Sequence, residues 1–220
     1  MLIVSAFTEL QAAVLGLLAS LAAPAGGEPR EFTAPAEVTA NDLEEVYIED
    51  VKYFGTGCSE DTAEVVLAED KKSFILIYRE MIIDRQDESD PELQTKNCVA
   101  AVSLHIPEGL KTAVSTVVMR GSAVLDKDIR LELRSKYFYA GNPTSVGGRF
   151  ELVGPYDDSF DFPDTEPFGP WSNCGESGLY GINTSMHLDA GDNDEGRALV
   201  NMEVTDVGLK IECDLKWEKC

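Results

Sequence analysis

Two histidines occur in the sequence, and neither lies in a recognisable catalytic motif. His105 and His187 each fall in a segment where apolar and polar residues alternate, on the side opposite to the apolar residues. In a β-strand this alternation places both imidazoles on the solvent face. No GxSxG or HExxH motif lies near either histidine. A Ser-His-Asp site assembled by the fold stays open as an alternative, but no catalytic residue can be named, and we expect a protein that is not an enzyme.

The segment DAGDNDEG, residues 189–196, offers oxygen ligands of the kind that calcium prefers. The candidates are Asp189, Asp192, Asn193 and Asp194. Their spacing does not match an EF-hand loop, and an ordinary acidic hairpin loop is the favoured interpretation. A second acidic segment, YDDSFDFPD at 156–164, is interpreted in the same way. Calcium is therefore the one cofactor that remains possible, and no other is indicated.

One sequon for N-glycosylation is usable. Asn183-Thr184-Ser185 fits the pattern, whereas Asn142-Pro143-Thr144 is blocked by its proline. Asn183 shares the outward side of its strand with Ser185 and His187, so a glycan on Asn183 would point into solvent.

A basic row stands out in this acidic chain. In DIRLELRSKYFY, residues 128–139, the outward positions hold Arg130, Glu132, Arg134 and Lys136, while Ile129, Leu131 and Leu133 point the other way. The favoured interpretation is an ordinary solvated face. The alternative is a docking stripe formed by Arg130, Arg134 and Lys136, which would contact the acidic surface of a neighbouring molecule.

The elements that must position these residues are almost all strands. From residue 46 onward, short segments of alternating or continuous apolar residues are separated by Gly, Pro, Asn and Asp. This pattern predicts an all-β domain over residues 46–220, an Ig-like or jelly-roll β-sandwich. The segment FILIYREMII, which begins at Phe74, is apolar on both sides as far as Tyr78, and predicts a central strand covered on both faces.

The totals restrict the partners. The chain has 220 residues and a formal charge of -22, which argues against nucleic acid and anionic membranes. Residues 11–23 are apolar, with the length of a signal-peptide core and short for a membrane span. We expect residues 1–25 to be a signal peptide, the mature protein to be secreted, and no stable membrane span after processing. A retained hydrophobic helix is the alternative.

Five cysteines fit a secreted protein with disulfides and one spare thiol, since two bridges among five cysteines allow 15 pairings. In GLKIECDLKW, residues 208–217, Cys213 shares a face with Leu209, Ile211 and Trp217. This places Cys213 in the core, as a small buried hydrophobic residue.

An N-terminal arm, residues 26–45, precedes this domain. REFTAPAEVTA, residues 30–40, alternates with the period of a strand, and its apolar side comprises Phe32, Ala34, Ala36, Val38 and Ala40. The arm either covers an edge of its own sheet or acts as a donor strand that completes the sheet of a neighbouring copy. Strand exchange of the second kind does not close on itself and builds a fibre.

Several motifs occur in the order found in a known family. They are GTGC at 55–58, KNCVAAVSLHIPEG at 96–109, VVMRGSAVLD at 117–126, GPY at 154–156, WSNCGESGLYGINTSM at 171–186 and the final Trp217 to Cys220. In these motifs the chain resembles the domain-of-unknown-function 4360 family of small secreted proteins. The resemblance implies a secreted β-sandwich with bridges Cys58–Cys98 and Cys174–Cys220, leaving Cys213 free. The family has no assigned activity.

Two functions follow as hypotheses. The first is a structural subunit whose partners are copies of itself, polymerising into an extracellular filament through the donor strand. The second is a monomeric module that binds surface glycans or wall polysaccharide through an exposed aromatic platform, with candidates Phe168, Trp171 and Tyr180.

Overall fold

The computed structural model describes residues 36–164, 169–201 and 209–220. Within these ranges the chain forms thirteen strands and one 3₁₀ turn, η1 (Asn41–Leu43), with no α-helix. The predicted all-β sandwich is therefore confirmed. No helix in the described ranges is long and apolar enough to cross a membrane.

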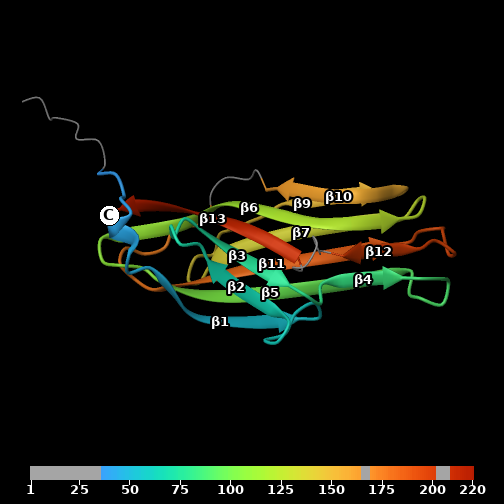
Figure 1. Cartoon of the computed structure of the whole chain (residues 1–220), viewed down its shortest axis with the longest axis horizontal. Coiled ribbons are helices and arrows are strands. Elements are labelled where there is room, and N and C mark those ends of the chain that lie inside the picture. The colour runs from blue at the N-terminus through green and yellow to red at the C-terminus, as the bar shows by residue number, and fades with distance from the viewer. Residues whose placement is uncertain (1–35, 165–168, 202–208) are drawn as a thin grey trace, which may run out of the picture. The chain divides into compact units, whose positions relative to one another are not determined.

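The strands form two antiparallel sheets (Figure 1). The first sheet contains β1 (Tyr47–Gly55), β5 (Leu93–His105), β11 (Gly178–Asp189), β7 (Arg130–Tyr139), β8 (Ser145–Val146) and β9 (Arg149–Val153). The second contains β2 (Ala63–Leu67), β3 (Ser73–Tyr78), β13 (Leu209–Lys219), β6 (Leu110–Leu125), β12 (Ala198–Asn201), β4 (Ile82–Arg85) and β10 (Tyr156–Pro163). Neighbours such as β5 and β11 are distant in sequence, as the crossing connections of a sandwich require.

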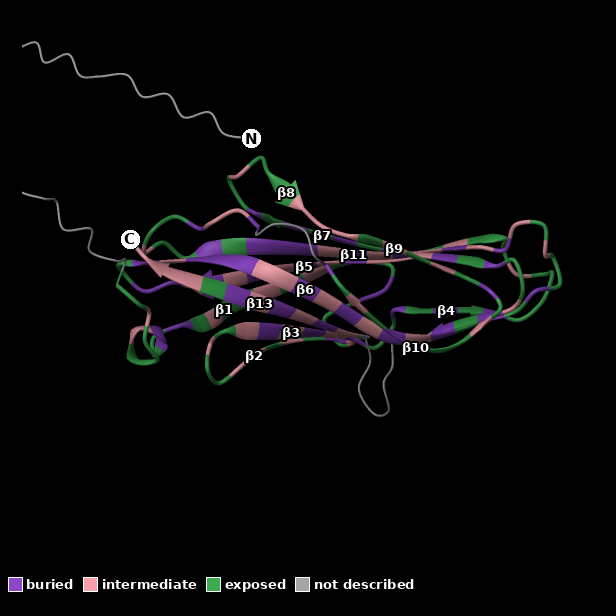
Figure 2. Cartoon of the chain, turned by 90° about the horizontal axis from the view of Figure 1, so that it is seen from above, coloured by how far each residue is buried: buried purple, intermediate pink, exposed green. Residues whose placement is uncertain are grey.

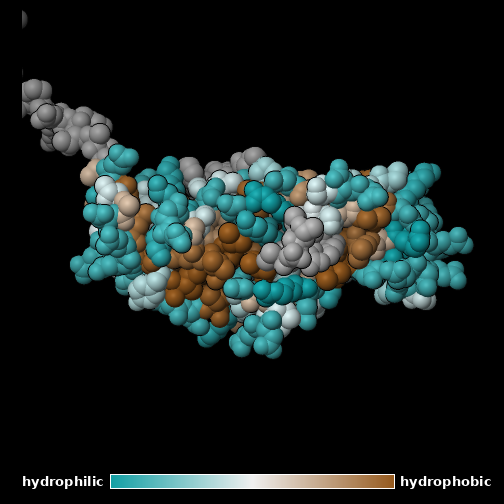
Figure 3. Space-filling model, in the orientation of Figure 1, coloured by the Kyte–Doolittle hydropathy of each residue, from teal (hydrophilic) through white to brown (hydrophobic). Residues whose placement is uncertain are grey.

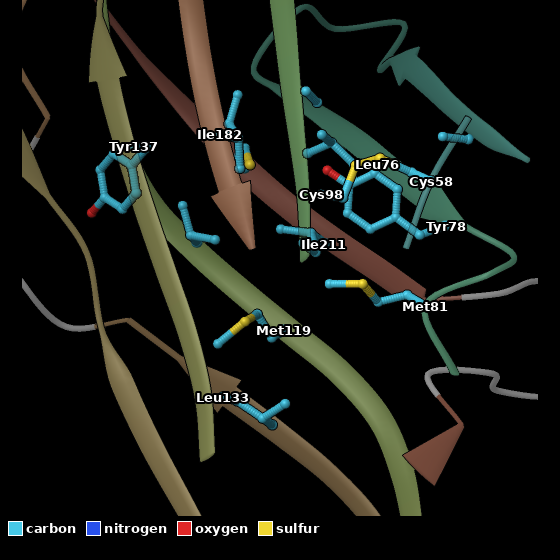
Figure 4. Packing of buried hydrophobic residues seen from close by; sticks show 14 of the residues in the cluster. Cys58, Leu76, Tyr78, Met81, Cys98, Met119, Leu133, Tyr137, Ile182 and Ile211 are labelled. Carbon is cyan, nitrogen blue, oxygen red and sulfur yellow. A yellow bond between two sulfur atoms is a disulfide. The ribbon is translucent and has the colours of Figure 1, made fainter. Parts of the chain in front are cut away.

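The core lies between the two sheets, which Figure 2 shows as two layers. Burial alternates along the strands, so that every second side chain of β7 and β11 points inward. Leu133 and Tyr137 of β7 face the same interior as Met119 of β6 and Ile211 of β13 (Figure 4). Each fully buried side chain of this kind contributes about 1.5–3 kcal/mol to folding. This packing fixes which side chains of β7 and β11 remain on the outer face of the first sheet.

The strand β3 has neighbours on both edges, β2 and β13, as expected of a central strand. The prediction that both its faces are covered is wrong. Phe74, Leu76 and Tyr78 are buried, but Ile75 and Ile77 are only partly buried. The reason is that nothing in the described chain packs on the outer face of the second sheet here, and Figure 3 shows apolar side chains gathered over β2 and β3.

The cysteines follow the pattern implied by the family resemblance. Cys58 is bonded to Cys98 and Cys174 to Cys220, while Cys213 is a buried free thiol. Burial raises the pKa of the Cys213 thiol well above its usual value, so this side chain stays protonated and unreactive.

The N-terminal arm is not a strand over its described residues. Residues 36–39 have no regular structure, and Ala40 has helical φ and ψ. The physical reason is a local turn, since the Thr39 N–H and hydroxyl both donate to the Asp42 carboxylate at 2.7 Å beside the η1 turn. Val38 packs against the core, whereas Ala36 and Ala40 are exposed. Phe32 and Ala34, the other predicted donor residues, lie outside the described residues.

Candidate functional site

The basic row lies on the outer face of the first sheet, as the alternation predicts. Antiparallel register places Lys136 of β7 opposite Asn183 of β11, Arg134 opposite Ser185, Glu132 opposite His187 and Arg130 opposite Asp189. On the other side of β7, Arg149 of β9 lies opposite Arg134. Arg149 is the basic residue that the sequence reading missed, because pairing between β7 and β9 is not visible in the chain order.

Two adjoining hollows follow this face of β7. The first, of about 450 Å³, is lined by charged residues of β7 and β9 and by His187 and Asp189. The second, of about 430 Å³, is lined by Arg134, Lys136, Arg149, Asn183, Ser185 and the Ser145–Gly148 segment. Arg134 and Arg149 line both, so we treat the two hollows together as one groove, called the β7 groove. Its size is typical of ligand sites.

Ion pairs order the arginines of the β7 groove. Glu132 pairs with Arg134 and with Arg149, and its side chain is only 13% exposed beneath them. Arg149 also lies 3.8 Å from Glu151, which contacts Arg130 at 3.4 Å. The hydrogen bond from Arg134, followed by the charges of Arg134 and Arg149, lowers the pKa of Glu132 despite its burial. Glu132 is therefore ionised at neutral pH and holds two guanidinium groups in place.

Charge is unevenly distributed along the β7 groove. The first hollow contains three arginines balanced by Glu132, Glu151 and Asp189. The lining of the second contains Arg134, Lys136 and Arg149 and no carboxylate. Lys136 is exposed and forms no ion pair with any described residue. The second hollow is thus a cationic end of the β7 groove.

The wall of the cationic end is fixed by backbone contacts between β7 and the β8–β9 segment. The Ser135 N–H donates to the Gly148 carbonyl at 3.0 Å, and the Gly148 N–H donates to the Ser135 hydroxyl at 3.1 Å. A Cβ at Gly147 would overlap the Ser135 carbonyl, so this close approach requires glycine. The groove wall is consequently part of the sheet rather than a free loop.

An aromatic ring lies beside the cationic end. Phe138 of β7 is 37% exposed and pairs across the sheet with Gly181 of β11. A Cβ added at Gly181 would lie within 2.5 Å of Cζ, Cε1 and Cε2 of Phe138. These similar distances place the added atom over the face of the ring, so the ring lies flat on the Gly181 backbone. The ring is partly exposed, and Lys136 lies two residues away on the same face of β7.

The aromatic platform predicted at Trp171 and Tyr180 is not formed. Tyr180 is buried in the core, and its hydroxyl donates to the Thr112 carbonyl at 2.9 Å. Trp171 is half-buried, with the Lys111 ammonium 4.9 Å from its ring centre. The third candidate, Phe168, lies outside the described residues. Tyr180 points inward because it shares the apolar side of β11 with Ile182 and Met186.

Asn183 faces outward, as the alternation predicts, but it lies on a central strand in the floor of the β7 groove. Its side chain is half-buried, and the buried Oδ1 finds no hydrogen-bond partner among the described residues. Thr184, the middle residue of the sequon, is fully buried. A glycan on Asn183 would therefore occupy the β7 groove; its presence stays a prediction.

The acidic loop at 189–196 is held by an arginine. Arg85 donates to the Gly196 carbonyl, and to the Asp194 carbonyl at 2.7 Å. The Asp189 carboxylate accepts the Gly191 N–H at 2.9 Å, and Asn193 donates to the Lys127 carbonyl at 2.7 Å. Asp192 and Asp194 do not join these groups in a ligand set, since no three acidic, histidine or cysteine side chains in the described ranges are placed to hold a metal. The other acidic segment, 156–164, forms β10, and its Asp161 pairs with Arg120 at 3.1 Å.

Both histidines lie on outward faces, as predicted, and neither has the partners of a catalytic triad. His187 Nε2 contacts Ser185 Oγ at 3.2 Å, and Nδ1 contacts Thr95 Oγ1 at 3.1 Å, so no carboxylate orients the ring. Nδ1 of His105 lies 3.3 Å from Ser177 Oγ and 3.5 Å from Glu49. A catalytic triad places the serine and the acid on opposite nitrogens of the ring, whereas Ser177 and Glu49 both lie near Nδ1 of His105.

Comparison with known proteins identifies the family of this chain and supports its secretion. A family model described as "Domain of unknown function (DUF4360)" matches residues 44–220, which agrees with the resemblance found in the sequence. An uncharacterized secreted protein of Arthroderma benhamiae is 27% identical over 183 residues, spanning 82% of this chain and 74% of the relative. The predicted secreted localisation is confirmed.

Two solved structures have a weak overall similarity to this chain. One is TmCBM61 in complex with beta-1,4-galactotriose, with 9% identity, a TM-score of 0.28 and coverage of 83% of this chain and 97% of that chain. The other is the enzymatically active domain of bacteriophage CBA120 tailspike protein 4, with 12% identity, a TM-score of 0.22 and coverage of 81% and 20%. Neither similarity assigns a ligand to this chain.

Proposed function

The chain belongs to the DUF4360 family of secreted β-sandwich proteins, and from that premise we propose that it is a polysaccharide-binding module that uses the β7 groove. One observation carries the proposal. The partly exposed ring of Phe138 lies flat on Gly181, two residues along β7 from Lys136, which lines the groove together with Asn183. A flat apolar surface next to a row of polar side chains matches the two-sided chemistry of a pyranose ring.

The chemistry of the match is specific. One face of a sugar ring presents C–H groups, which pack on an aromatic ring, while its hydroxyl groups need hydrogen-bond partners. Lys136 supplies donors, and the half-buried Asn183 supplies an amide side chain in the lining of the groove. All three side chains are on strands of one sheet, which makes their spacing rigid. The site is therefore formed before any ligand binds.

The setting supports a glycan partner outside the cell. The protein is secreted, and its charge of -22 disfavours nucleic acid and anionic membranes. In the β7 groove the Ser185 hydroxyl lies 3.2 Å from His187 Nε2, but the other ring nitrogen meets Thr95 rather than a carboxylate. We propose no catalytic role, because neither described histidine has triad geometry. The proposal requires no cofactor.

Filament assembly has less support. Residues 36–40 of the predicted donor strand are not extended into a strand, and the arm from Thr39 to Leu43 folds onto its own domain. In the basic row, predicted as a possible docking stripe for another copy, Arg130 pairs with Glu151 and Arg134 with Glu132 of their own sheet, which leaves Lys136 without an ion pair among the described residues. Strand donation by residues 26–35 remains a prediction.

The experiment is a binding survey with the secreted protein on a panel of soluble plant and fungal wall polysaccharides, followed by calorimetry with the best ligand. Phe138→Ala should weaken binding at least about tenfold, the usual loss for a central aromatic contact. Gly181→Ala should have a similar effect with Phe138 still present, because the added Cβ displaces the ring. Because the overlapping atoms belong to the far end of the Phe138 side chain and not to backbone, Gly181→Ala should still fold.

Trp171→Ala is the matched aromatic control, and it should bind as the unmodified protein does. Loss of binding in Trp171→Ala with normal binding in Phe138→Ala would move the site to the Trp171 loop. A folded protein that binds no polysaccharide of the panel would overturn the proposed function.

A further inference from the structure

We infer that the β7 groove selects polysaccharides that carry anionic groups, such as uronate carboxylates or sulfate esters, over neutral ones. This inference rests on the proposed function and adds the class of ligand. The feature that points to it is the cationic end, formed by Arg134, Lys136 and Arg149.

The composition of the chain makes this end unusual. Asp and Glu outnumber Lys and Arg by 40 to 18. Yet the lining of the cationic end holds three basic side chains and no carboxylate. Glu132 balances only part of this positive charge, and the remaining repulsion among the basic groups costs electrostatic energy. An anionic group bound among the three would relieve that repulsion.

The two arginines are arranged for a bound anion. Their side chains are 53% and 63% exposed, so the guanidinium groups reach solvent, while Glu132 beneath them is 13% exposed. A guanidinium held by one carboxylate still presents further N–H donors, and its planar fork suits carboxylate and sulfate oxygens. Glu132 is thus a positioning residue that fixes the arginines before the ligand arrives.

Lys136 supplies the uncompensated charge. It forms no ion pair within the described chain and lies two residues from Phe138 on the same face of β7. Residues at this spacing on one strand are about 6.5–7 Å apart. A sugar ring stacked on Phe138 would therefore bring an anionic substituent, its own or that of the next sugar, within reach of the ammonium group.

The test compares three soluble polymers by calorimetry with the full secreted chain. They are polygalacturonate, the same polymer after reduction of its carboxyl groups, and a sulfated galactan. We expect polygalacturonate to bind at least about tenfold more tightly than the reduced polymer. Tight binding of the sulfated polymer alone would identify sulfate rather than carboxylate as the recognised anion, and still supports the inference.

The variant R134Q/K136Q/R149Q should lose this preference. K72Q/K127Q/R197Q is the matched control, with the same change in net charge away from the groove, and should keep it. Equal binding of polygalacturonate and the reduced polymer by the unmodified protein would overturn the inference and leave the proposed function standing. Binding to none of the polymers, with self-association that R134Q/K136Q/R149Q abolishes, would show that the groove docks a second copy and would overturn both.

Glu132→Gln distinguishes positioning from simple charge. Removing this carboxylate makes the groove more positive, so attraction alone predicts tighter binding of polygalacturonate. Because the arginines lose the group that orients them, we expect weaker binding instead, by about threefold or more. An increase in affinity would overturn the positioning role.

Discussion

Arg85 carries its charge deep inside the second sheet. The side chain is 2% exposed, and its guanidinium donates to the carbonyls of Asp194 and Gly196 in the acidic loop. It forms no ion pair with any described residue, and its Nε lacks a hydrogen-bond partner in the described chain. The Arg85 guanidinium therefore stabilises the same loop, residues 189–196, in which the sequence suggested a calcium site.

Replacing Arg85 by Met should destabilise the protein by about 2–4 kcal/mol, because two buried carbonyls lose their donors while the apolar stem is retained. Urea denaturation followed by fluorescence measures this free energy. Arg130→Met is the matched control. Arg130 is mostly exposed and its pair with Glu151 is long, so we expect a loss of at most about 1 kcal/mol. Equal stability of the two variants would contradict the structural role of Arg85.

Some residue positions could be predicted from alternation alone. The inward Cys213, the outward histidines and the outward basic row follow from the period of a strand. The same rule places Tyr180 in the core, and the platform prediction went wrong by neglecting it. The flat packing of Phe138 on Gly181 could not be predicted, because it depends on the register between β7 and β11, which the sequence leaves undetermined.

At the scale of elements, side-chain contacts of the η1 turn hold the N-terminal arm against β13, the last strand. Asp42 accepts hydrogen bonds from Thr39 and lies 3.0 Å from the Lys219 ammonium of β13. The backbone hydrogen bond from Thr39, its hydroxyl and Lys219 together lower the pKa of Asp42 to about 2. The turn is therefore more stable when Asp42 is ionised.

This lowered pKa sets a pH window for the arm. An ordinary Asp titrates near about 3.9, so the contribution of Asp42 is fully present above about pH 4 and is lost as the pH falls through about 2. Carbon-detected NMR should give a carboxylate midpoint near 2. The stability difference between the unmodified protein and Asp42→Asn should be constant at neutral pH and shrink below about pH 4. A midpoint near the ordinary value would show that the hydrogen bonds from Thr39 to Asp42 do not form in solution.

The strands themselves were largely predictable, since turn residues separate segments of alternating apolar residues from residue 46 onward. What could not be predicted is their pairing. The family resemblance, rather than spacing, implied Cys58–Cys98 and Cys174–Cys220, which the structure confirms. The β7 groove needs β7, β9 and β11 side by side, and no pattern within one strand reveals that order.

For the whole molecule, the main quantity is the net charge of -22. Copies of such a chain repel one another, although salt screens this repulsion beyond about 8 Å at physiological ionic strength. A filament would need many close contacts between like-charged surfaces, with the basic residues of the β7 groove already paired in part with Glu132 and Glu151. A monomeric protein avoids these contacts between copies.

This reasoning predicts the behaviour of the arm. The secreted protein and a form lacking residues 26–41 should both give single particles by electron microscopy and monomers by sedimentation, because Val38 packs on its own domain and no described residue of the arm forms a strand that could complete another sheet. Both forms should also bind the same polysaccharide with similar affinity, since no residue of the arm lines the β7 groove. Fibres in the first sample that vanish in the second would instead establish strand donation by residues 26–41, and the polysaccharide site would then be displayed along a filament.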